Sequence, residues 1–332
     1  MISKPLVVNP FVILLLIGLG LFVLVQWRAA AREAAVEAEY PPSGQFIDVD
    51  GTLIHINVAG QGPDIVLIHG ASGSLRDFTL DLATRLADSY RVIAVDRPGL
   101  GRSQRPGGFG GIWSAAAEPP ALQAQLLQAA TDMVGVENPI VVGHSYGGAI
   151  ALAWALERPN ETAALVLLAA ASNPWPGSLG LLYRINSTAI GSAIVIPLIT
   201  AFTPHALIED TLGEIFAPQQ PPPNYMQHFG PDMTLRRSTM RANAQQVNAL
   251  KPYVTEMVTR YPTLSMPVEI LHGTEDVTVP MAIHSEPLSR QIPNAELTRM
   301  EGIGHMPHHA DPDAVVAAIH RAAARAGLPS SD

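Results

Sequence analysis

Short apolar runs alternate with amphipathic stretches through much of the chain. Four of the runs are continuous, at residues 65–68, 92–95, 140–142 and 165–168, as is typical of parallel strands buried on both faces. The stretches between them have helical spacing, at residues 76–87, 121–133 and 146–157. Because such strand–helix–strand connections are right-handed, the pattern predicts an α/β protein with a mostly parallel sheet covered by helices on both faces.

A second pattern frames these units. Residues 45–49 and 52–59 flank Asp50-Gly51, a strong signal for a two-residue hairpin. After the sixth predicted strand, residues 172–262 are proline-rich and helix-like, and strand patterns return only at 268–271 and 296–300, before a final helix at 312–326. We therefore expect a core at 45–171 and 263–328, with a helical cap inserted at 172–262.

The N-terminal region has a different character. Residues 11–25 are all apolar or glycine, and the apolar stretch from Leu6 to Trp27 reaches the roughly 20 residues that a membrane-spanning helix requires. We interpret residues 1–28 as a retained single-pass anchor, with a cleaved signal sequence ending near Ala29 or Ala31 as the alternative. Residues 29–44 are predicted as a stalk or linker. The flanking positive charges nearly balance, and we favour the extracytoplasmic side for the domain.

Composition narrows the classes of function. The chain has 332 residues, of which 48% are hydrophobic and 15% charged. Its net charge of −9, without a basic cluster, argues against nucleic-acid binding. The absence of cysteine excludes disulfides, thiolate metal sites and cysteine catalysis.

The candidate nucleophile is Ser145, in the sequence Gly143-His144-Ser145-Tyr146-Gly147. A G-x-S-x-G match is meaningful when it joins a buried strand to a helix, as this one is predicted to do. Side chains at Gly143 or Gly147 would collide with neighbouring elements at so sharp a turn. The main-chain amide of Tyr146, at the start of the helix, can face a developing oxyanion.

The candidate base and acid follow later strands. His305 lies in a glycine-flanked loop after the predicted strand at 296–300, and Asp276 follows the strand at 268–271. The resulting order Ser, Asp, His is one of three known for this constellation. Glu275 is the rival acid because it is adjacent to Asp276. The remaining histidines that we considered are expected to be solvated or on the surface: His308, His309, His55, His284 and His320.

With these motifs the sequence resembles the α/β-hydrolase superfamily, in its capped, esterase-like branch. The resemblance covers about residues 45–326 and includes the motifs His69-Gly70-Ala71-Ser72-Gly73 and Asp96-Arg97-Pro98-Gly99-Leu100-Gly101-Arg102-Ser103. It implies that the amide of Ala71 is the second oxyanion donor, that His69 supports its loop, and that the Asp96 loop is structural. A serine nucleophile excludes the branches that use aspartate, namely haloalkane dehalogenases and epoxide hydrolases.

The expected activity is hydrolysis of an acyl bond, most simply a carboxylic ester, through an acyl-enzyme that requires no metal or organic cofactor. Hydrolysis of a C–C bond or an amide on the same triad is the enzymatic alternative, and an inactive membrane-anchored binding protein is the remote one. Residues 189–202 are apolar nearly all round but are interrupted by Pro197 and are too short for a second span. They predict a small-molecule substrate with an apolar acyl or alcohol group.

Overall fold

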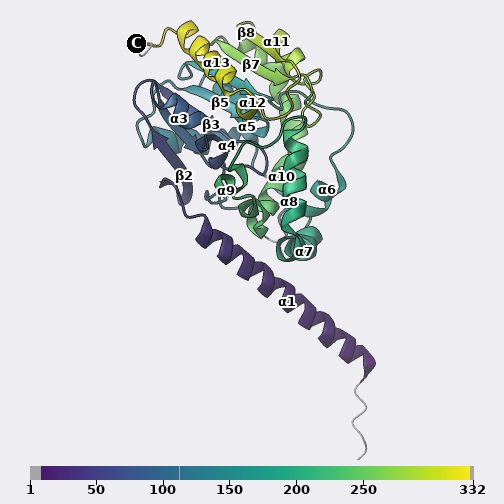
Figure 1. Ribbon diagram of the computed structural model, residues 1–332. Helices are drawn as coiled ribbons and strands as arrows, with labels where there is room; N and C mark the ends of the chain where they lie inside the picture. Colours follow the sequence, from purple (N-terminus) through teal and green to yellow (C-terminus); the bar gives the residue numbers. More distant parts are fainter. Residues whose placement is uncertain (1–8, 112, 330–332) are drawn as a thin grey trace, which may run out of the picture.

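The computed structural model describes residues 9–111 and 113–329 (Figure 1). Eight strands form one sheet: β1 (Gln45–Val49), β2 (Thr52–Ala59), β3 (Asp64–Ile68), β4 (Arg91–Val95), β5 (Ile140–His144), β6 (Ala164–Leu168), β7 (Val268–Gly273) and β8 (Ala295–Met300). Their order is β1-β2-β4-β3-β5-β6-β7-β8. β2 is antiparallel to both of its neighbours, β1 and β4, and all the other pairs are parallel. The predicted α/β fold is therefore confirmed.

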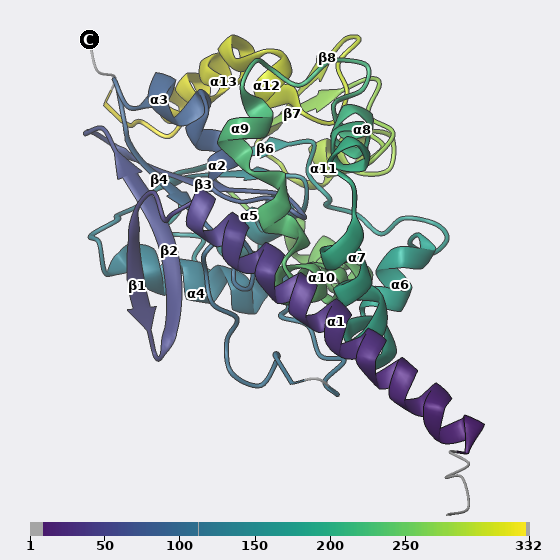
Figure 2. The ribbon, with the colours of Figure 1, turned by 60° about the horizontal axis from the view of Figure 1, so that its bottom comes forward.

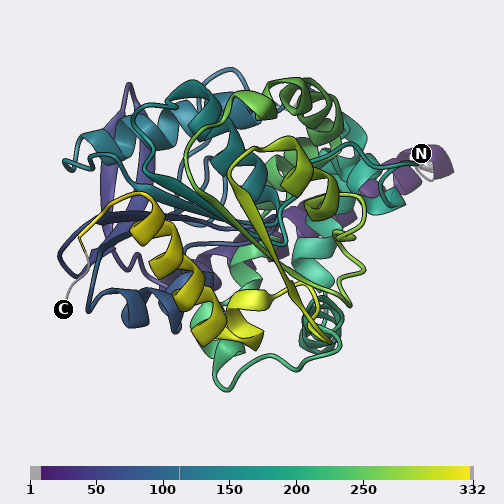
Figure 3. The same cartoon turned by 90° about the horizontal axis from the view of Figure 1, so that it is seen from above.

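Helices cover both faces of the sheet (Figure 3). They are α2 (Arg76–Thr79), α3 (Leu82–Leu86), α4 (Pro120–Asp132), α5 (Tyr146–Glu157), α11 (Ser285–Gln291), α12 (Pro307–Ala310) and α13 (Pro312–Arg325). Alternate strand residues bury on opposite faces, so that Val66 packs with α4 and α5 while Leu67 packs with α3 and α13. The continuous apolar runs are explained by this double burial.

Helices and turns fill the stretch between β6 and β7, which the sequence predicts as a cap and which keeps that name below. It comprises α6 (Leu181–Asn186), the π-helix η1 (Gly191–Val195), α7 (Ile196–Phe202), α8 (His205–Phe216), α9 (Tyr225–Phe229), the 3₁₀ turn η2 (Pro231–Leu235), α10 (Arg237–Met257) and the 3₁₀ turn η3 (Val258–Thr263). The cap has an apolar centre of its own, which includes Ile208, Leu212, Phe216 and Tyr225. That centre also contains Met306, which directly follows the candidate base.

One predicted helix is divided in two. The spacing of residues 76–87 predicts a single helix, whereas the chain leaves helical geometry at Asp81 (φ −147°) between α2 and α3. The break lets Phe78 of α2 and Leu82 of α3 bury in the same cluster under the sheet. Asp77 is buried as well, on a side of α2 that meets the cap.

The N-terminal helix α1 (Pro10–Glu39) has two unlike halves. Its first half projects from the domain and exposes apolar side chains from Phe11 to Leu24, with an 18-residue window of mean hydropathy 2.4 (Figure 1). Its second half lies along the cap beside α7 (Figure 2). Arg32 there pairs with Asp232 at 2.6 Å, and Arg237 of α10 pairs with Glu33 at 2.7 Å. One face of the stretch expected as a linker is thus packed against the cap, while most of its residues are exposed.

Candidate active site

Ser145 stands in a strained turn between β5 and α5. Its φ of 53° and ψ of −118° lie in a region that non-glycine residues rarely adopt. A Cβ on Gly143 would lie 2.4 Å from the carbonyl oxygen of Gly147, and one on Gly147 would lie 2.1 Å from that of Ile68. The turn therefore admits only glycine at both positions, and it holds the serine at the carboxyl end of the central strands.

The loops after β7 and β8 bring Asp276 and His305 to this serine. His305 Nε2 lies 3.0 Å from Ser145 Oγ, and His305 Nδ1 lies 2.7 Å from Asp276 Oδ2. All three residues are buried. Since the imidazole bridges the hydroxyl and the carboxylate, this arrangement can pass a proton from the serine to the histidine while the carboxylate stabilises the imidazolium.

Asp276 is fixed by several donors besides His305. Its Oδ1 accepts the main-chain N–H groups of Thr278 and Val279, at 2.8 and 2.9 Å. Burial raises the pKa of the Asp276 carboxyl, but hydrogen bonds from His272 and His305 outweigh it and bring the pKa below its ordinary value. The carboxylate therefore stays ionised through the neutral range.

His272 is a residue that sequence reasoning missed. Its Nε2 lies 3.1 Å from Asp276 Oδ2 and 2.7 Å from the carbonyl oxygen of Val279, two acceptors, so this nitrogen carries the proton. Its Nδ1 then accepts from the Ser285 hydroxyl at 2.6 Å. The only sequence signal was a histidine four residues before the acid. Glu275, the rival acid, is exposed and does not face His305.

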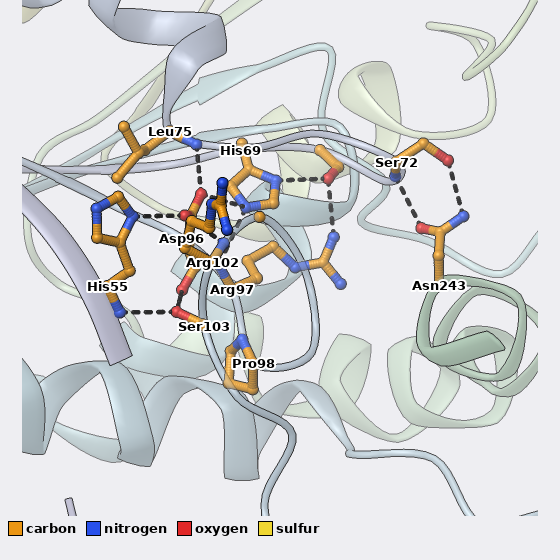
Figure 4. Close-up of polar contacts among 12 residues, drawn as sticks. His55, His69, Ser72, Leu75, Asp96, Arg97, Pro98, Arg102, Ser103 and Asn243 are labelled. Atoms are coloured by element: carbon orange, nitrogen blue, oxygen red, sulfur yellow. Dashed lines mark hydrogen bonds and ion pairs between the residues drawn. The ribbon is translucent and has the colours of Figure 1, made fainter. Parts of the chain in front are cut away.

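The loop expected to supply an oxyanion donor is braced from two sides (Figure 4). Arg97 donates to the Gly70 carbonyl at 2.9 Å, immediately before Ala71. Ser72 N–H donates to Asn243 Oδ1, and Asn243 Nδ2 donates to Ser72 Oγ, both at 2.8 Å. Asn243 belongs to α10, so a cap side chain that sequence reasoning did not single out fixes the shape of this loop.

The Asp96 loop supports the same region from below (Figure 4). Asp96 accepts from Leu75 N–H at 2.7 Å, from Arg102 N–H at 2.8 Å and from His55 Nδ1 at 2.7 Å. His69 Nε2 accepts from Arg97 N–H at 3.0 Å, and burial lowers the pKa of His69 to about 4. A neutral, fully used histidine of this kind acts as loop support.

A second buried carboxylate lies near the site. Asp77 accepts from His308 Nε2 at 3.0 Å, from His309 Nε2 at 2.9 Å and from the Tyr225 hydroxyl of the cap at 2.9 Å. The two histidine nitrogens and the carboxylate lie within 4.8 Å of one another, a set of donors that could hold a metal ion. The His308 ring lies 4.6 Å from that of His144, whose Nε2 donates to the His305 carbonyl.

The expectation for the remaining histidines was wrong at several positions. His308 and His55 were predicted to be solvated or superficial, yet they are only 1% and 2% exposed because each meets a buried aspartate. His284 is buried as well, and its Nδ1 accepts main-chain N–H groups of residues 172 and 173. The side chain of His309 is buried too, against Asp77, and only His320 remains exposed.

The cap also contacts the loop that carries His305. Gln219 donates to the Gly302 carbonyl at 2.8 Å and accepts from Gly304 N–H at 3.0 Å. A Cβ on Gly304 would lie 2.0 Å from the Ala217 carbonyl oxygen, so the two segments can approach only because residue 304 is glycine. The cap thus fixes both the loop expected to supply an oxyanion donor and the loop that carries His305.

Comparison with known proteins agrees with this fold. The family model "Alpha/beta hydrolase family" matches residues 65–318. The chain belongs to that family. A 2-hydroxy-6-oxononadienedioate/2-hydroxy-6-oxononatrienedioate hydrolase of a Pseudomonas species is 26% identical over 81% of the chain and 93% of that protein.

Solved structures share the fold over nearly their whole length. An alpha/beta hydrolase fold protein from Burkholderia ambifaria superposes with a TM-score of 0.68 at 24% identity, covering 84% of this chain and 97% of that one. A bacterial membrane phospholipase A gives a TM-score of 0.65 at 21% identity, covering 94% of this chain and 97% of that one. The chain is therefore a hydrolase by family.

Proposed function

We propose that this alpha/beta hydrolase is a membrane-anchored serine hydrolase that cleaves carboxylic esters with apolar acyl or alcohol groups. The observation that carries the proposal is the continuous chain of contacts from Asp276 through His305 to Ser145, with 2.7 and 3.0 Å between the bonded atoms. A serine so placed can be activated at neutral pH, because its proton has an acceptor within hydrogen-bond distance.

The reaction follows from these positions. Ser145 Oγ attacks the acyl carbonyl while its proton passes to His305 Nε2, and the resulting imidazolium gives that proton to the leaving alkoxide as the C–O bond breaks. Water then attacks the acyl-enzyme, losing its proton to His305 Nε2, and the proton returns to Ser145 as the acid leaves. Asp276 holds the proton-bearing Nδ1 throughout.

Main-chain amides are proposed to stabilise the oxyanion. Tyr146 N–H begins α5, where the amides of the first turn have no partners within the helix. Ala71 N–H is the second donor, and its loop is held by Arg97 at Gly70 and by Asn243 at Ser72. Removing one such donor typically costs on the order of 10²-fold in kcat, which gives the cap a direct influence on rate through Asn243.

An ester with an apolar group is favoured by the surface of the cap. Leu198 and Phe202 are 42% and 49% exposed, more apolar surface than helix packing requires. The second candidate is hydrolysis of a C–C bond, and the name of the Pseudomonas relative favours it. Both reactions use the same serine, histidine and aspartate, so they differ in what the cap admits.

We propose that α1 anchors the protein in a membrane. Its first half exposes apolar side chains over a length that can cross a bilayer. A signal-peptidase site at Ala29 or Ala31 would fall inside a helix that is packed on the cap, and Ala29 is fully buried. This burial favours a retained anchor over a cleaved signal.

A fluorophosphonate probe tests the nucleophile. The full-length protein in detergent should carry one label on the peptide containing Ser145, and Ser145→Ala should carry none. The labelled enzyme should lose hydrolysis of p-nitrophenyl esters, a series in which kcat/KM should rise from acetate toward medium chains by up to about fourfold per methylene. A label elsewhere, or turnover of vinylogous diketones but not of esters, would contradict the proposal.

A further inference from the structure

A cavity of about 480 Å³ lies apart from the serine, where the loop after β4, the π-helix η1 and the start of α10 meet. Five arginines line it: Arg102, Arg105, Arg236, Arg237 and Arg241. Its other lining residues are glycine, serine, threonine and glutamine, so no carboxylate lines it in the described part of the chain. Such a lining is complementary to an anion with several acceptor oxygens.

Carboxylates around the cavity neutralise only some of these arginines. Arg105 pairs with Glu118 at 2.6 Å, Arg236 with Glu37 at 2.8 Å and Arg237 with Glu33 at 2.7 Å. Arg102 instead donates to main-chain carbonyls, those of Glu37 at 2.7 Å and of Tyr40. The ion pairs found among residues 9–111 and 113–329 do not include Arg102.

The environment of Arg102 indicates positive charge that the nearby carboxylates do not fully neutralise. Burial lowers the pKa of Arg102 and the neighbouring Arg236 lowers it further, which together outweigh the opposite effects of Glu37 and Asp96. The cavity also opens on the first turn of α10, a 21-residue helix, through Ser238 and Thr239. The positive end of the helix dipole adds to the arginine charge at this point, so a bound anion would relieve repulsion rather than create a new charge.

The cavity lies along the half of α1 that follows the proposed membrane span. Arg237 donates to Gln26 Oε1 at 2.6 Å, one residue before Trp27, and Gln26 contacts the Ala193 carbonyl next to the cavity residue Ser192. Tryptophan and arginine at the end of an apolar span, as at Trp27 and Arg28 within α1, mark the lipid headgroup level. With α1 as the anchor, the Ser192 end of the cavity lies at this level.

Apolar surface continues from the cavity toward the membrane. Ser192 belongs to η1, in which Ile194 is 52% exposed. Ile190, directly before η1, is 72% exposed. Leu24 of α1, 49% exposed, precedes Gln26. An arginine cavity bordered by exposed apolar side chains matches an amphiphile that carries its charge at one end.

We infer that this cavity binds the phosphate group of a membrane phospholipid, whose acyl chains lie along the exposed apolar side chains of α1 and η1. The inference rests on the proposed anchoring of α1, and it adds a lipid-binding site separate from the serine. The bound lipid would fasten α1 to the cap, because the cavity arginines already contact both.

The test uses the full-length protein in detergent and native mass spectrometry. Three probes are titrated: dioleoyl phosphatidylglycerol, dioleoylglycerol with the same chains but no phosphate, and inorganic phosphate. Ser238→Glu is the decisive variant, because it places a carboxylate in the cavity at an exposed position near the N-terminus of α10, where an acid favours the helix. Ser238→Gln is its neutral control of equal size, and Arg299→Gln removes an arginine on β8.

Phosphatidylglycerol should bind wild type, Ser238→Gln and Arg299→Gln alike, and its dissociation constant should rise about tenfold or more in Ser238→Glu and in Arg102→Gln. Dioleoylglycerol that binds equally well in all variants would overturn the inference, since apolar contact alone would then suffice. Inorganic phosphate that binds as tightly as the lipid would overturn it in favour of a free anion. A carbonate wash of native membranes reports the anchor independently, so failure of the anchor and failure of the cavity are distinguishable.

Discussion

Two buried aspartates in this protein are each surrounded by histidines, and only one of them is linked through a histidine to a serine. Asp276 accepts from His305 and His272, and Asp77 accepts from His308 and His309. Burial raises the pKa of both carboxyls, but the histidines bring it below its ordinary value. At Asp276 they act chiefly through hydrogen bonds, and at Asp77 through the charge of His308 together with hydrogen bonds from His308 and His309. In burial and bond lengths the two clusters are nearly alike.

They differ at the far side of the imidazole. His305 directs its second nitrogen at Ser145, 3.0 Å away, whereas His308 Nδ1 is buried without a hydrogen-bond partner among the described residues. Asp77 meets Tyr225 of the cap instead of a reacting group. A histidine–aspartate pair is therefore only half of a catalytic arrangement, and the same pair elsewhere can join two parts of a fold.

The largest expected effect comes from Ser145. Ser145→Ala should lower kcat for p-nitrophenyl esters by about 10³-fold or more, because the remaining groups act only as a unit with the nucleophile. His305→Ala should cost about as much. Circular dichroism should show an intact fold in both variants, and full activity in purified Ser145→Ala would falsify the assignment.

Matched substitutions at the two aspartates should separate their roles. Asp276→Asn should lower kcat by about 10³-fold, since the amide cannot hold the correct histidine tautomer. Asp77→Asn should change kcat by less than about tenfold but lower the free energy of unfolding by about 2 kcal/mol, because it weakens a buried hydrogen-bonded cluster. Steady-state kinetics and thermal unfolding of both proteins are the measurements. A larger loss of kcat at Asp77 than at Asp276 would reverse the comparison.

The cluster around Asp276, the candidate catalytic one, was more predictable from sequence than the cluster around Asp77. Ser145, Asp276 and His305 each follow a strand of the sheet, and the carboxyl ends of parallel strands meet at one edge, so the positions of the three residues after their strands bring them together. Asp77 and His308 form their cluster with Tyr225, and sequence patterns do not reveal which surface a cap helix will cover. His308 therefore looked solvated.

The same distinction holds elsewhere in the molecule. The strands were predictable because a continuous apolar run has one simple explanation, burial on both faces. The supports contributed by Asn243 and Gln219 were not, because each is a polar residue whose partner lies far away in sequence. A single polar residue does not form a periodic sequence pattern, so only its tertiary contacts reveal its role.

Acid should unfold the protein through its buried neutral histidines. Burial lowers the pKa of His69 to about 4, and it lowers the pKa of His308 and of His144 as well, from an ordinary value of about 6.5. The unfolded chain thus binds more protons between pH 6.5 and 4, so stability is complete above pH 6.5 and is lost as the pH falls through that window. Each such histidine contributes up to about 1.4 kcal/mol per pH unit.

Urea unfolding from pH 8 to pH 4.5 measures this slope. His308→Gln should lower this slope by the equivalent of about one bound proton at most, because the variant removes one of the groups that take up a proton on unfolding. Stability that is level from pH 8 to pH 4.5 would contradict the assignment of these histidines as buried and neutral.

The smallest expected effect is at Glu275, the neighbour of the catalytic aspartate. Its side chain is exposed, while its main-chain N–H donates to the Ile303 carbonyl at 2.9 Å, a bond that any residue except proline can make. Glu275→Gln should therefore change kcat and KM by less than about twofold and leave the free energy of unfolding within about 0.5 kcal/mol of wild type. The matched comparison is Asp276→Asn, which makes the same chemical change one residue later. If Glu275→Gln lost more activity than Asp276→Asn, the wrong carboxylate would have been assigned to His305, whatever the 2.7 Å contact of Asp276 suggests.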